Sequence, residues 1–472
     1  MKILLTGATG YIGQRLLPVL LEEGHEVICC VRDKDRFNRK RFPSGNLQII
    51  EIDFLDVKTL DQIPENIDAA YFLVHSMATI NDDFENLERI TANNFKSGIE
   101  KTKARQVIYL SGIVNEQNLS KHLRSRKKVE EILSEGSYKL TTLRAGIIIG
   151  SGSSSFEIMR DLVEKLPVMI APKWLATKSQ PVAIGNVVEF LKGVLLNEKT
   201  YDQSFDIGGP DILTYKEMLL RFAEIRNLKR KIITVPVMTP RLSSYWLYFV
   251  TSTSFSLAKH LVDSMKVEVI CRENELKDWL GINLISYDDA IRLAFDKIEH
   301  QEVFSSWTDA TTSHILDRGI SKLIEVPVHG CFKDKRECKI KDVDITLKNI
   351  WAIGGKNGWY YADWLWELRG FIDKLWGGVG LRRGRKSSTE IIPGDAIDFW
   401  RVLVASKEDK RLLLYAEMKL PGEAWLEFTI INNTLSQIAT FRPLGLWGRL
   451  YWYSLLPFHA FIFKGMLKNI SA

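Results

Sequence analysis

Residues 3–13 read Ile-Leu-Leu-Thr-Gly-Ala-Thr-Gly-Tyr-Ile-Gly, and this stretch decides the fold of the first part of the chain. A short apolar run is followed by three glycines, and residues 15–24 then place apolar side chains at helical spacing. The pattern predicts a strand, a glycine turn and a helix, whose free N–H groups bind a pyrophosphate. A turn with a purely structural role is the alternative. The residues expected to contact a dinucleotide are Gly7, Thr9, Gly10, Tyr11, Ile12 and Gly13.

The second predicted strand, residues 25–32, indicates which dinucleotide binds. NAD-binding proteins place an acidic residue at the end of this strand for the ribose 2′-hydroxyl. Here that position holds Val31, and Arg32 follows it. A guanidinium pairs with a 2′-phosphate, which a carboxylate would repel. We therefore expect NADPH in preference to NADH, and the competing interpretation is that Arg32 is a solvated loop residue.

The composition describes an ordinary globular protein. Of the 472 residues, 46% are hydrophobic and 26% are charged, and the length suggests about two to four domains. A net charge of +6 is too diffuse to indicate nucleic-acid binding. Five scattered cysteines favour a reducing compartment over a disulfide framework. We expect no signal peptide before the first strand, and the longest uncharged stretches, 242–258 and 450–463, are too short to span a bilayer. We expect a cytoplasmic protein.

Strand-like and helical segments alternate through the first half of the chain. Further strands are predicted at 47–52, 69–74, 106–110 and 140–149, with helices at 86–103 and 126–133. This alternation predicts an α/β, Rossmann-type doubly wound parallel sheet. The predicted reductase-like domain covers residues 1–300, with a Rossmann core at 1–180 and a substrate lobe at 180–300 that includes a short strand at 203–207.

The composition changes after residue 300, where ten of the 13 tryptophans lie. Consecutive strand-like runs occur at 396–405, 410–417, 424–431 and 435–442, and a long helical segment follows at 447–470. This order predicts an α+β domain over residues 301–472, in which an antiparallel sheet wraps on the helix.

Several of these segments resemble the extended, or atypical, short-chain dehydrogenase/reductases. The resemblance is carried by Thr6–Gly13, Asp53 in Asp-Phe-Leu-Asp, Ser111 at the end of the fifth strand, and Leu143–Gly150, and it covers about residues 1–300. Segments 72–77 and 180–183 are similar to a bacterial subfamily in which the reductase is fused to a second domain. Residues 354–360 and 369–370 carry that second part, which resembles the START/polyketide-cyclase (helix-grip) superfamily.

The resemblance assigns roles to single residues. It implies that Asp53 accepts a hydrogen bond from the adenine amino group and that Ser111 polarises a substrate carbonyl. The family follows this Ser with Tyr-x-x-x-Lys, in which the Lys lowers the pKa of the proton-donating Tyr. Aligned on Glu130, the present chain has His122 and Arg126 at those two positions, and it has no tyrosine between Tyr109 and Tyr138.

Two interpretations of this pair remain open. In one, His122 donates the proton, since imidazole titrates near neutral pH, and Arg126 grips the cofactor. In the other, both are solvated residues of a basic helix. His75, just after the fourth strand, lies where nucleotide sites form and is a second candidate acid, or else it caps or packs. Tyr109 lies in the middle of a strand and is expected in the core.

The second half suggests a hydrophobic-ligand domain. Its resemblance implies an apolar cavity for a sterol, polyketide, lipid or quinone, which Trp359, Tyr360, Trp364 and Trp366 would line unless they are ordinary core. Residues 428–472 contain no acidic residue but include Arg442, Arg449, Lys464 and Lys468. This segment would suit peripheral contact with an anionic membrane, although a helix packed on its own sheet also needs no acids.

Two functions are compatible with these features. The first is an NADPH-dependent oxidoreductase that acts on an apolar carbonyl, enone or quinone-like substrate. The second is a catalytically degenerate NADPH-binding sensor or scaffold that couples cofactor occupancy to a lipid-like ligand or a protein partner.

Overall fold

The chain forms two compact units, which are described in turn. Unit 1 comprises Met1–Thr251 and Phe255–Thr311, and unit 2 comprises Thr312–Ala472 with Ser252–Ser254. The computed structural model describes residues 1–32, 34, 37, 39, 42, 44–74, 84–114, 121–235, 265–299, 326, 331–376, 378–380, 390–443 and 445–471.

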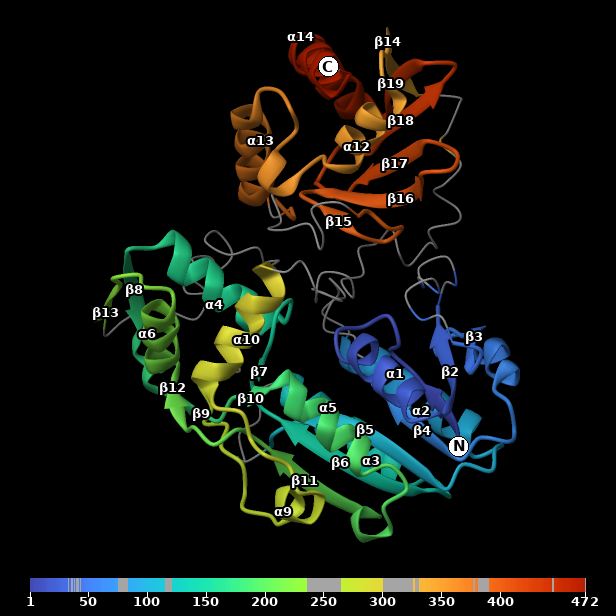
Figure 1. The fold of residues 1–472 in the computed structure, drawn as a ribbon, viewed down its shortest axis with the longest axis vertical. Coiled ribbons are helices and arrows are strands. Elements are labelled where there is room, and N and C mark those ends of the chain that lie inside the picture. The colour runs from blue at the N-terminus through green and yellow to red at the C-terminus, as the bar shows by residue number, and fades with distance from the viewer. Residues whose placement is uncertain are drawn as a thin grey trace. The chain divides into compact units, whose positions relative to one another are not determined.

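Unit 1 is built on a seven-stranded sheet in the order β11-β6-β5-β4-β1-β2-β3, coloured from blue to green in Figure 1. All neighbouring pairs are parallel, which confirms the predicted Rossmann-type sheet. The strands are β1 (Lys2–Leu5), β2 (Glu26–Val31), β3 (Leu47–Glu51), β4 (Ala69–Phe72), β5 (Gln106–Gly112), β6 (Lys139–Ala145) and β11 (Gln203–Ile207).

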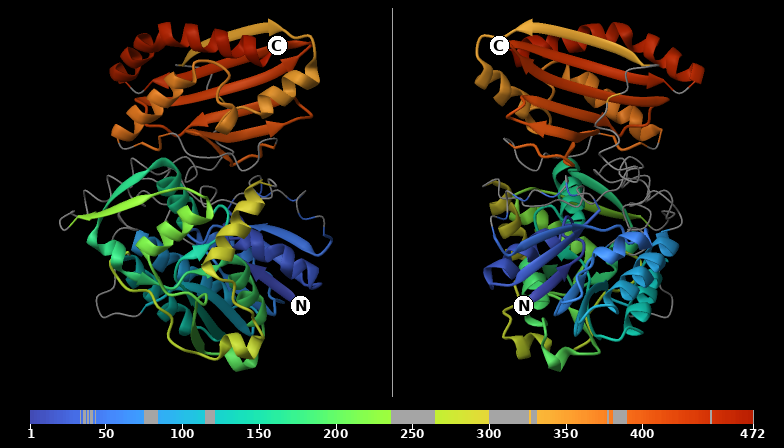
Figure 2. Two further views of the ribbon diagram at one scale, coloured as in Figure 1. Left: turned by 60° about the vertical axis from the view of Figure 1, so that its left-hand side comes forward. Right: turned by 90° about the vertical axis from the view of Figure 1, so that its right-hand side faces the viewer.

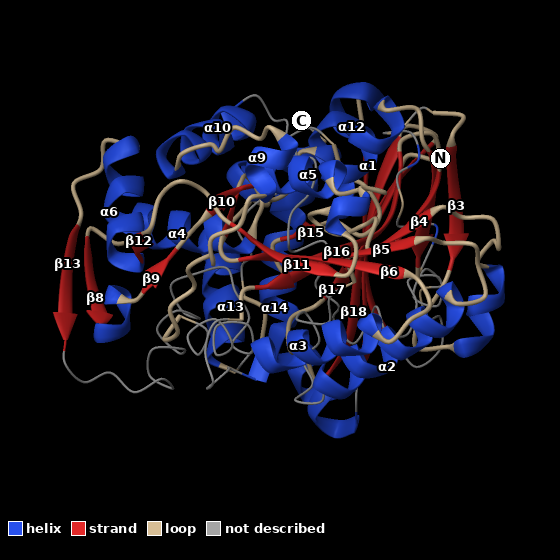
Figure 3. Cartoon of the chain, turned by 90° about the horizontal axis from the view of Figure 1, so that it is seen from below, coloured by secondary structure: helices blue, strands red, loops and turns tan. Residues whose placement is uncertain are grey.

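Helices cover both faces of this sheet (Figure 3). On one face, α1 (Gly13–Glu22) and α5 (Ile184–Gly193) pack in a core that includes Ile3, Leu5 and Tyr71. The opposite face packs against α2 (Phe84–Ile99) and α3 (Lys121–Ser134), in a core that includes Phe72 and Tyr109. Alternate residues of the strands therefore pack into two separate cores, as expected for strands that are buried on both faces.

Two strand predictions need correction. The strand expected at 140–149 divides into β6 and a separate short strand β7 (Ile148–Ile149), which pairs with β10 (Val182–Ala183). Gly146 lies at the break and is closely packed, since a Cβ atom there would lie 3.0 Å from Val269 Cγ1. The strand predicted at 203–207 is present as β11, but it pairs with β6 as part of the main sheet and does not stand in the lobe.

A third core in unit 1 forms the lobe beside the sheet. It contains α4 (Ser154–Lys165), α6 (Tyr215–Ile225) and α10 (Tyr287–Glu299), whose inward rings Phe156, Phe222 and Phe295 lie with centroids 5.3–5.5 Å apart. The pair β8 (Val168–Pro172) and β13 (Lys231–Val235) and the pair β9 (Lys178–Ser179) and β12 (Leu213–Thr214) lie at its edges, and α9 (Leu276–Leu280) packs near α5. Part of this core therefore precedes residue 180.

Unit 2 has a six-stranded antiparallel sheet in the order β14-β19-β18-β17-β16-β15 (Figure 2). Its strands are β14 (Phe332–Lys339), β15 (Ala396–Ile397), β16 (Trp400–Ser406), β17 (Arg411–Ala416), β18 (Gly422–Ile431) and β19 (Thr434–Pro443). One sheet face packs in a shared core with α12 (Val343–Trp351), α13 (Asp363–Leu375) and α14 (Gly445–Ile470). The predicted antiparallel α+β architecture is confirmed, and β14 is an additional strand.

The four aromatic residues expected to line a pocket do not act together. Trp359 and Trp366 are buried and stack with their ring centroids 4.8 Å apart, so they belong to the core. Trp364 is 63% exposed and lies on the outer surface of α13.

Candidate functional site

The glycine loop joins β1 to α1 with little space around it. Gly7 has a φ of +66°, and a Cβ atom there would lie 2.5 Å from Leu73 O on the neighbouring strand. The N–H of Gly10 donates to Gly7 O at 2.8 Å. A Cβ atom on Gly13 would overlap Gly7 O, so the helix can begin this close to the loop only with glycine.

The N-terminus of α1 is prepared for an anion. Its first turn contains no acidic residue, and Ile12 at the N-cap makes no side-chain cap. The helix dipole favours negative charge at this end of the helix. These features fit the pyrophosphate of a dinucleotide.

Arg15 holds the loop in shape. Its guanidinium donates to Tyr11 O at 3.1 Å and to Ser151 O at 2.7 Å, and it lies 3.9 Å from the centroid of the Tyr11 ring. Burial raises the pKa of Tyr11 to about 12, so its phenol is neutral at physiological pH. Tyr11 therefore serves the loop as a packed, neutral ring.

Arg32 and Asp53 follow two neighbouring strands at the same edge of the sheet. Val31 of β2 pairs with Glu51 of β3, and Arg32 is exposed directly after this pair. Asp53 is partly exposed; its carboxylate accepts from Leu55 N at 3.0 Å, and its backbone is fixed by the Thr59 hydroxyl. Both residues thus follow the carboxyl ends of neighbouring parallel strands, and their contact with the adenosine half of a cofactor stays a prediction.

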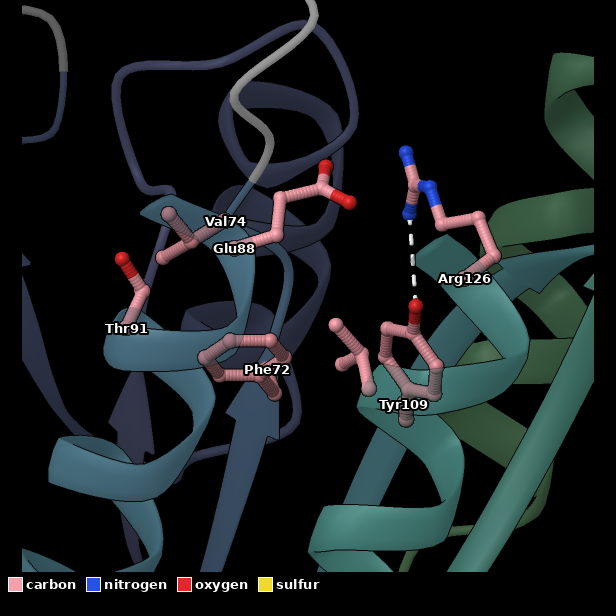
Figure 4. A pocket seen from close by; sticks show the side chains of 7 residues that line it. Phe72, Val74, Glu88, Thr91, Tyr109 and Arg126 are labelled. Atoms are coloured by element: carbon pink, nitrogen blue, oxygen red, sulfur yellow. Dashed lines mark hydrogen bonds between the residues drawn. The ribbon is translucent and has the colours of Figure 1, made fainter. Parts of the chain in front are cut away.

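A buried polar cluster lies beside the end of β5, between α2 and α3 (Figure 4). Ser111 is 5% exposed and Arg126 is 3% exposed, and the guanidinium of Arg126 donates to Tyr109 Oη at 3.5 Å. The carboxylate of buried Glu88 accepts from Ser125 Oγ at 2.5 Å, which links α2 to α3. Seven residues line the small pocket at this place: Phe72, Val74, Glu88, Thr91, Tyr109, Arg126 and Val129.

The interpretation of Arg126 as a solvated residue is therefore wrong. An ion pair sets the orientation of α3: Glu130, one turn after Arg126, accepts from Arg144 of β6 at 2.6 and 3.1 Å. Residues four apart share one helix face, so this pair turns Arg126 toward the sheet. Burial lowers the pKa of Arg126 to about 9, which still leaves the guanidinium cationic at neutral pH.

His122 and His75 cannot be placed with the cluster. His122 lies in α3 one turn before Arg126, but its side chain is outside the described residues, and so is the whole of His75.

Tyr109 is the functional candidate that the sequence prediction missed. It is buried as expected, but its hydroxyl lies in the polar cluster. Burial is the main cause that raises the pKa of Tyr109 well above its usual range, and the nearby hydroxyl of Ser111 partly opposes the shift. The available signal was its spacing from Ser111, because residues two apart in a strand point to the same face.

Comparisons with known proteins support a dinucleotide-binding fold for unit 1. Residues 7–165 match the family described as NAD(P)H-binding, and residues 329–466 match a family described as protein of unknown function (DUF2867). The fold of unit 1 is similar to a triphenylmethane reductase from Citrobacter sp. (14% identity, 63% of this chain and all of that chain, TM-score 0.52). It is also similar to a nucleoside-diphosphate-sugar epimerase from Staphylococcus aureus (13% identity, 62% of this chain and all of that chain, TM-score 0.51).

Two curated relatives are reductases. The chain is 26% identical over 254 residues to divinyl chlorophyllide a 8-vinyl-reductase of Arabidopsis thaliana, which covers 50% of this chain and 60% of the relative. It is 36% identical over 85 residues to ketoreductase nvfG of Aspergillus novofumigatus, which covers 17% of this chain and 25% of that relative. The chain thus spans about three fifths of the length of the first relative and a quarter of the second. Together with the match over residues 7–165, these similarities support a Rossmann-type, NAD(P)H-binding fold for the first part of the chain.

Proposed function

We propose that this protein is an NADPH-dependent reductase of an apolar carbonyl, enone or quinone-like substrate. The observation that carries the proposal is the position of Ser111, which is buried at the end of β5 beside the Tyr109–Arg126 pair. Parallel sheets bind ligands at the carboxyl ends of their strands. The relatives named as a vinyl-reductase and a ketoreductase support a reductive reaction.

The reaction adds a hydride to carbon and a proton to oxygen, or to carbon in an enone. When bound, NADPH would supply the hydride. Ser111 would donate a hydrogen bond to the substrate oxygen and stabilise the charge that develops there. The proton then comes either from Tyr109, whose hydroxyl lies in the polar cluster with Arg126, or from His122, which occupies the position of the family's Tyr.

The preference for NADPH rests on Arg32. It is exposed at the end of β2, and no carboxylate occupies the position that would receive the ribose hydroxyls in an NAD-binding protein. In this proposal the guanidinium of Arg32 pairs with the 2′-phosphate of NADPH.

The test is NADPH consumption by the full chain with defined enones, quinones and ketones, followed by an apolar host extract. Ser111→Ala is expected to lower kcat roughly hundredfold while the Kd for NADPH changes little. Tyr109→Phe and His122→Ala identify the proton donor, because one of them should lower kcat and the other should not. Tyr71→Phe is the matched control, since this buried tyrosine faces the opposite helix layer and donates to Leu191 O.

The sensor function is the second candidate, and the His at position 122 favours it, because the family's Tyr is absent. Tight NADPH binding without consumption of NADPH across all of these substrates would support the sensor. An unchanged kcat in Ser111→Ala would contradict the reductase mechanism.

We propose further that unit 2 holds a hydrophobic ligand, as the START-like resemblance implies. Gln437 of β19 is 1% exposed and points with Leu435 and Ala439 into the core beneath the helices. Among the described residues, neither end of its amide has a hydrogen-bond partner, and the same holds for the indole N–H groups of Trp366 and Trp400. Buried polar groups of this kind are rare, and the polar end of a ligand would satisfy them.

Organic extraction and mass spectrometry of the purified protein test this proposal. Gln437→Leu is expected to reduce the amount of co-purified ligand severalfold without loss of folding, since it removes an unsatisfied amide. Unchanged ligand content in this variant would exclude Gln437 from the binding site.

A further inference from the structure

Helix α14 is apolar on two opposite faces. Phe463, Met466, Leu467 and Ile470 pack in the core on the sheet. The other face exposes large apolar side chains, with Trp447 at 78% and Phe461 at 55%. The exposed apolar residues of this face are Trp447, Leu450, Tyr453, Leu456, Phe458 and Phe461. A soluble surface helix normally has a polar outer face, so an exposed apolar surface of this size indicates an interaction site.

Helix α13 has the same unusual arrangement. Its buried Asp373 accepts from Lys419 N at 2.7 Å and from Gly380 N at 2.8 Å, so a carboxylate faces inward. Its outer surface carries apolar residues spaced three and four apart, namely Trp364, Leu368, Phe371, Ile372, Leu375 and Trp376. The inner side of α13 thus holds a carboxylate beside the buried Trp366, while most of the exposed area of its outer side is contributed by large apolar residues.

The two surfaces belong to one layer of unit 2. Tyr361, just before α13, packs its ring against Phe461 with centroids 5.1 Å apart, and Asn469 donates to Tyr360 O at 2.7 Å. Both helices cover the same sheet face, as the left view of Figure 2 shows. We call the outer sides of α13 and α14 the apolar–basic face.

The charge of this face favours an anionic partner. α14 exposes Arg449, Lys464 and Lys468, and it contains no acidic residue. Lys464 and Lys468 lie three and seven residues after Phe461, which places them on the same side of the helix. α13 exposes Glu367 and Asp363, so the positive charge is concentrated along α14.

We propose that unit 2 docks on an anionic phospholipid bilayer through the apolar–basic face, with α14 lying in the plane of the interface. Aromatic side chains partition into the headgroup region, and the lysines pair with anionic headgroups. Among the described helices none is long and apolar enough to cross a bilayer, so α14 lies on the membrane in this arrangement. A second copy that paired α14 with α14 fits the face poorly, because a two-fold contact along this helix would bring the same cations together, and α14 has no acidic residue to oppose them.

Flotation of the full chain with vesicles tests the proposal. Binding is expected to vesicles that contain phosphatidylserine, to be much weaker to vesicles of phosphatidylcholine alone, and to fall as salt screens the lysines. Lys464→Glu/Lys468→Glu should weaken binding to the anionic vesicles by roughly tenfold or more. Trp447→Ser/Phe458→Ser should also weaken binding to the anionic vesicles, and lowering the salt concentration should not restore this binding.

The matched control is Lys333→Glu/Lys339→Glu, which makes the same change in net charge on exposed residues of β14. These residues alternate with Phe332 and Cys338, which face the helices, so they lie on the opposite face of the sheet. Control and lysine variants that bind equally well would overturn the proposal, and so would the absence of binding to anionic vesicles. A change from oligomer to monomer in Trp447→Ser/Phe458→Ser would also overturn it and assign the face to a second copy. NADPH affinity should be unchanged in all variants.

Discussion

At the residue scale, Arg126 is a charged group that folding disfavours. Burial lowers its pKa from 12.5 to about 9, which means that the charged form is less favourable in the folded protein than in the unfolded chain. This destabilisation of the folded protein disappears only as the pH rises from about 9 toward 12.5, because in that range the folded state has lost the proton and the unfolded chain still holds it. A cation kept in such a position beside Tyr109 is therefore a functional candidate.

Arg126→Met is expected to retain or raise thermal stability and to abolish substrate-dependent NADPH consumption. Removal of the buried charge relieves desolvation, while the site loses the cation that orients the phenol. Thermal denaturation and turnover are measured on the same preparation. The control is Arg124→Met, an exposed residue of the same helix, which should change neither quantity. A large loss of stability in Arg126→Met would show that the residue is structural.

Arg32→Asp is expected to reverse the cofactor preference. A charge-assisted hydrogen bond contributes about 1.5–3 kcal/mol, so the affinity for NADPH relative to NADH should fall by roughly tenfold to hundredfold. Kd values for both cofactors are measured by titration. Lys58→Asp makes the same change in charge on an exposed residue and should leave the ratio of the two Kd values unchanged. Equal effects of the two variants would assign the preference to general electrostatics.

The sequence located the positions of this site but could not decide which side chains are buried. Alignment on Glu130 found Arg126, yet five other basic residues in 121–128 gave no sign that this one faces inward. That depends on the Glu130–Arg144 pair, which joins a helix to a strand 14 residues away. The role of Tyr109 likewise depends on contact between β5 and α3.

At the element scale, the strand predictions were right where apolar residues follow a clear period. The parallel strands of unit 1 are nearly continuous apolar runs, and β16–β19 have buried residues that face a core. β14 was missed because it reads Phe-Lys-Asp-Lys-Arg-Glu-Cys-Lys, in which even inward positions are charged. Asp334 and Arg336 form an ion pair there at 2.9 Å, and the strand is held by pairing with β19 along its whole length.

Breaking the buried ion pair between Arg401 of β16 and Glu417, the residue after β17, should destabilise unit 2 far more than breaking the Arg411–Glu427 pair. Arg401 and Glu417 are both fully buried and joined by two hydrogen bonds of 2.9 and 3.1 Å, and Arg401 also donates to Gly394 O. Glu417→Ala leaves this guanidinium without its counter-ion and should cost about 3–5 kcal/mol. Glu427→Ala breaks the partly exposed Arg411–Glu427 pair and should cost about 1 kcal/mol or less. Chemical denaturation compares them, and equal losses would contradict the argument.

At the scale of the whole molecule, the two units have separate cores, and a ligand of one should not stabilise the other directly. NADPH at about 100 times its Kd should stabilise unit 1 by roughly 2.7 kcal/mol. Calorimetry is therefore expected to show two transitions, of which only one moves to higher temperature with NADPH. A single transition that shifts as a whole would show that the units unfold together.

The transition of unit 2 can be recognised by its pH dependence. His459 of α14 lies between the rings of Trp452 and Phe463, and burial lowers its pKa below 6.5, with Asp334 opposing and Arg336 adding to the shift. Above pH 6.5 the imidazole is neutral in both states and the stability is fully present. As the pH falls below 6.5, the unfolded chain binds the proton first, so unit 2 should lose up to about 1.4 kcal/mol of stability per pH unit until the folded-state pKa is reached.

His459→Phe should flatten this pH dependence in the transition that NADPH does not move. His25→Gln is the control, because burial also lowers the pKa of His25 but that residue belongs to unit 1. If His25→Gln, and not His459→Phe, flattened the pH dependence of the NADPH-insensitive transition, the assignment of the two transitions would be reversed.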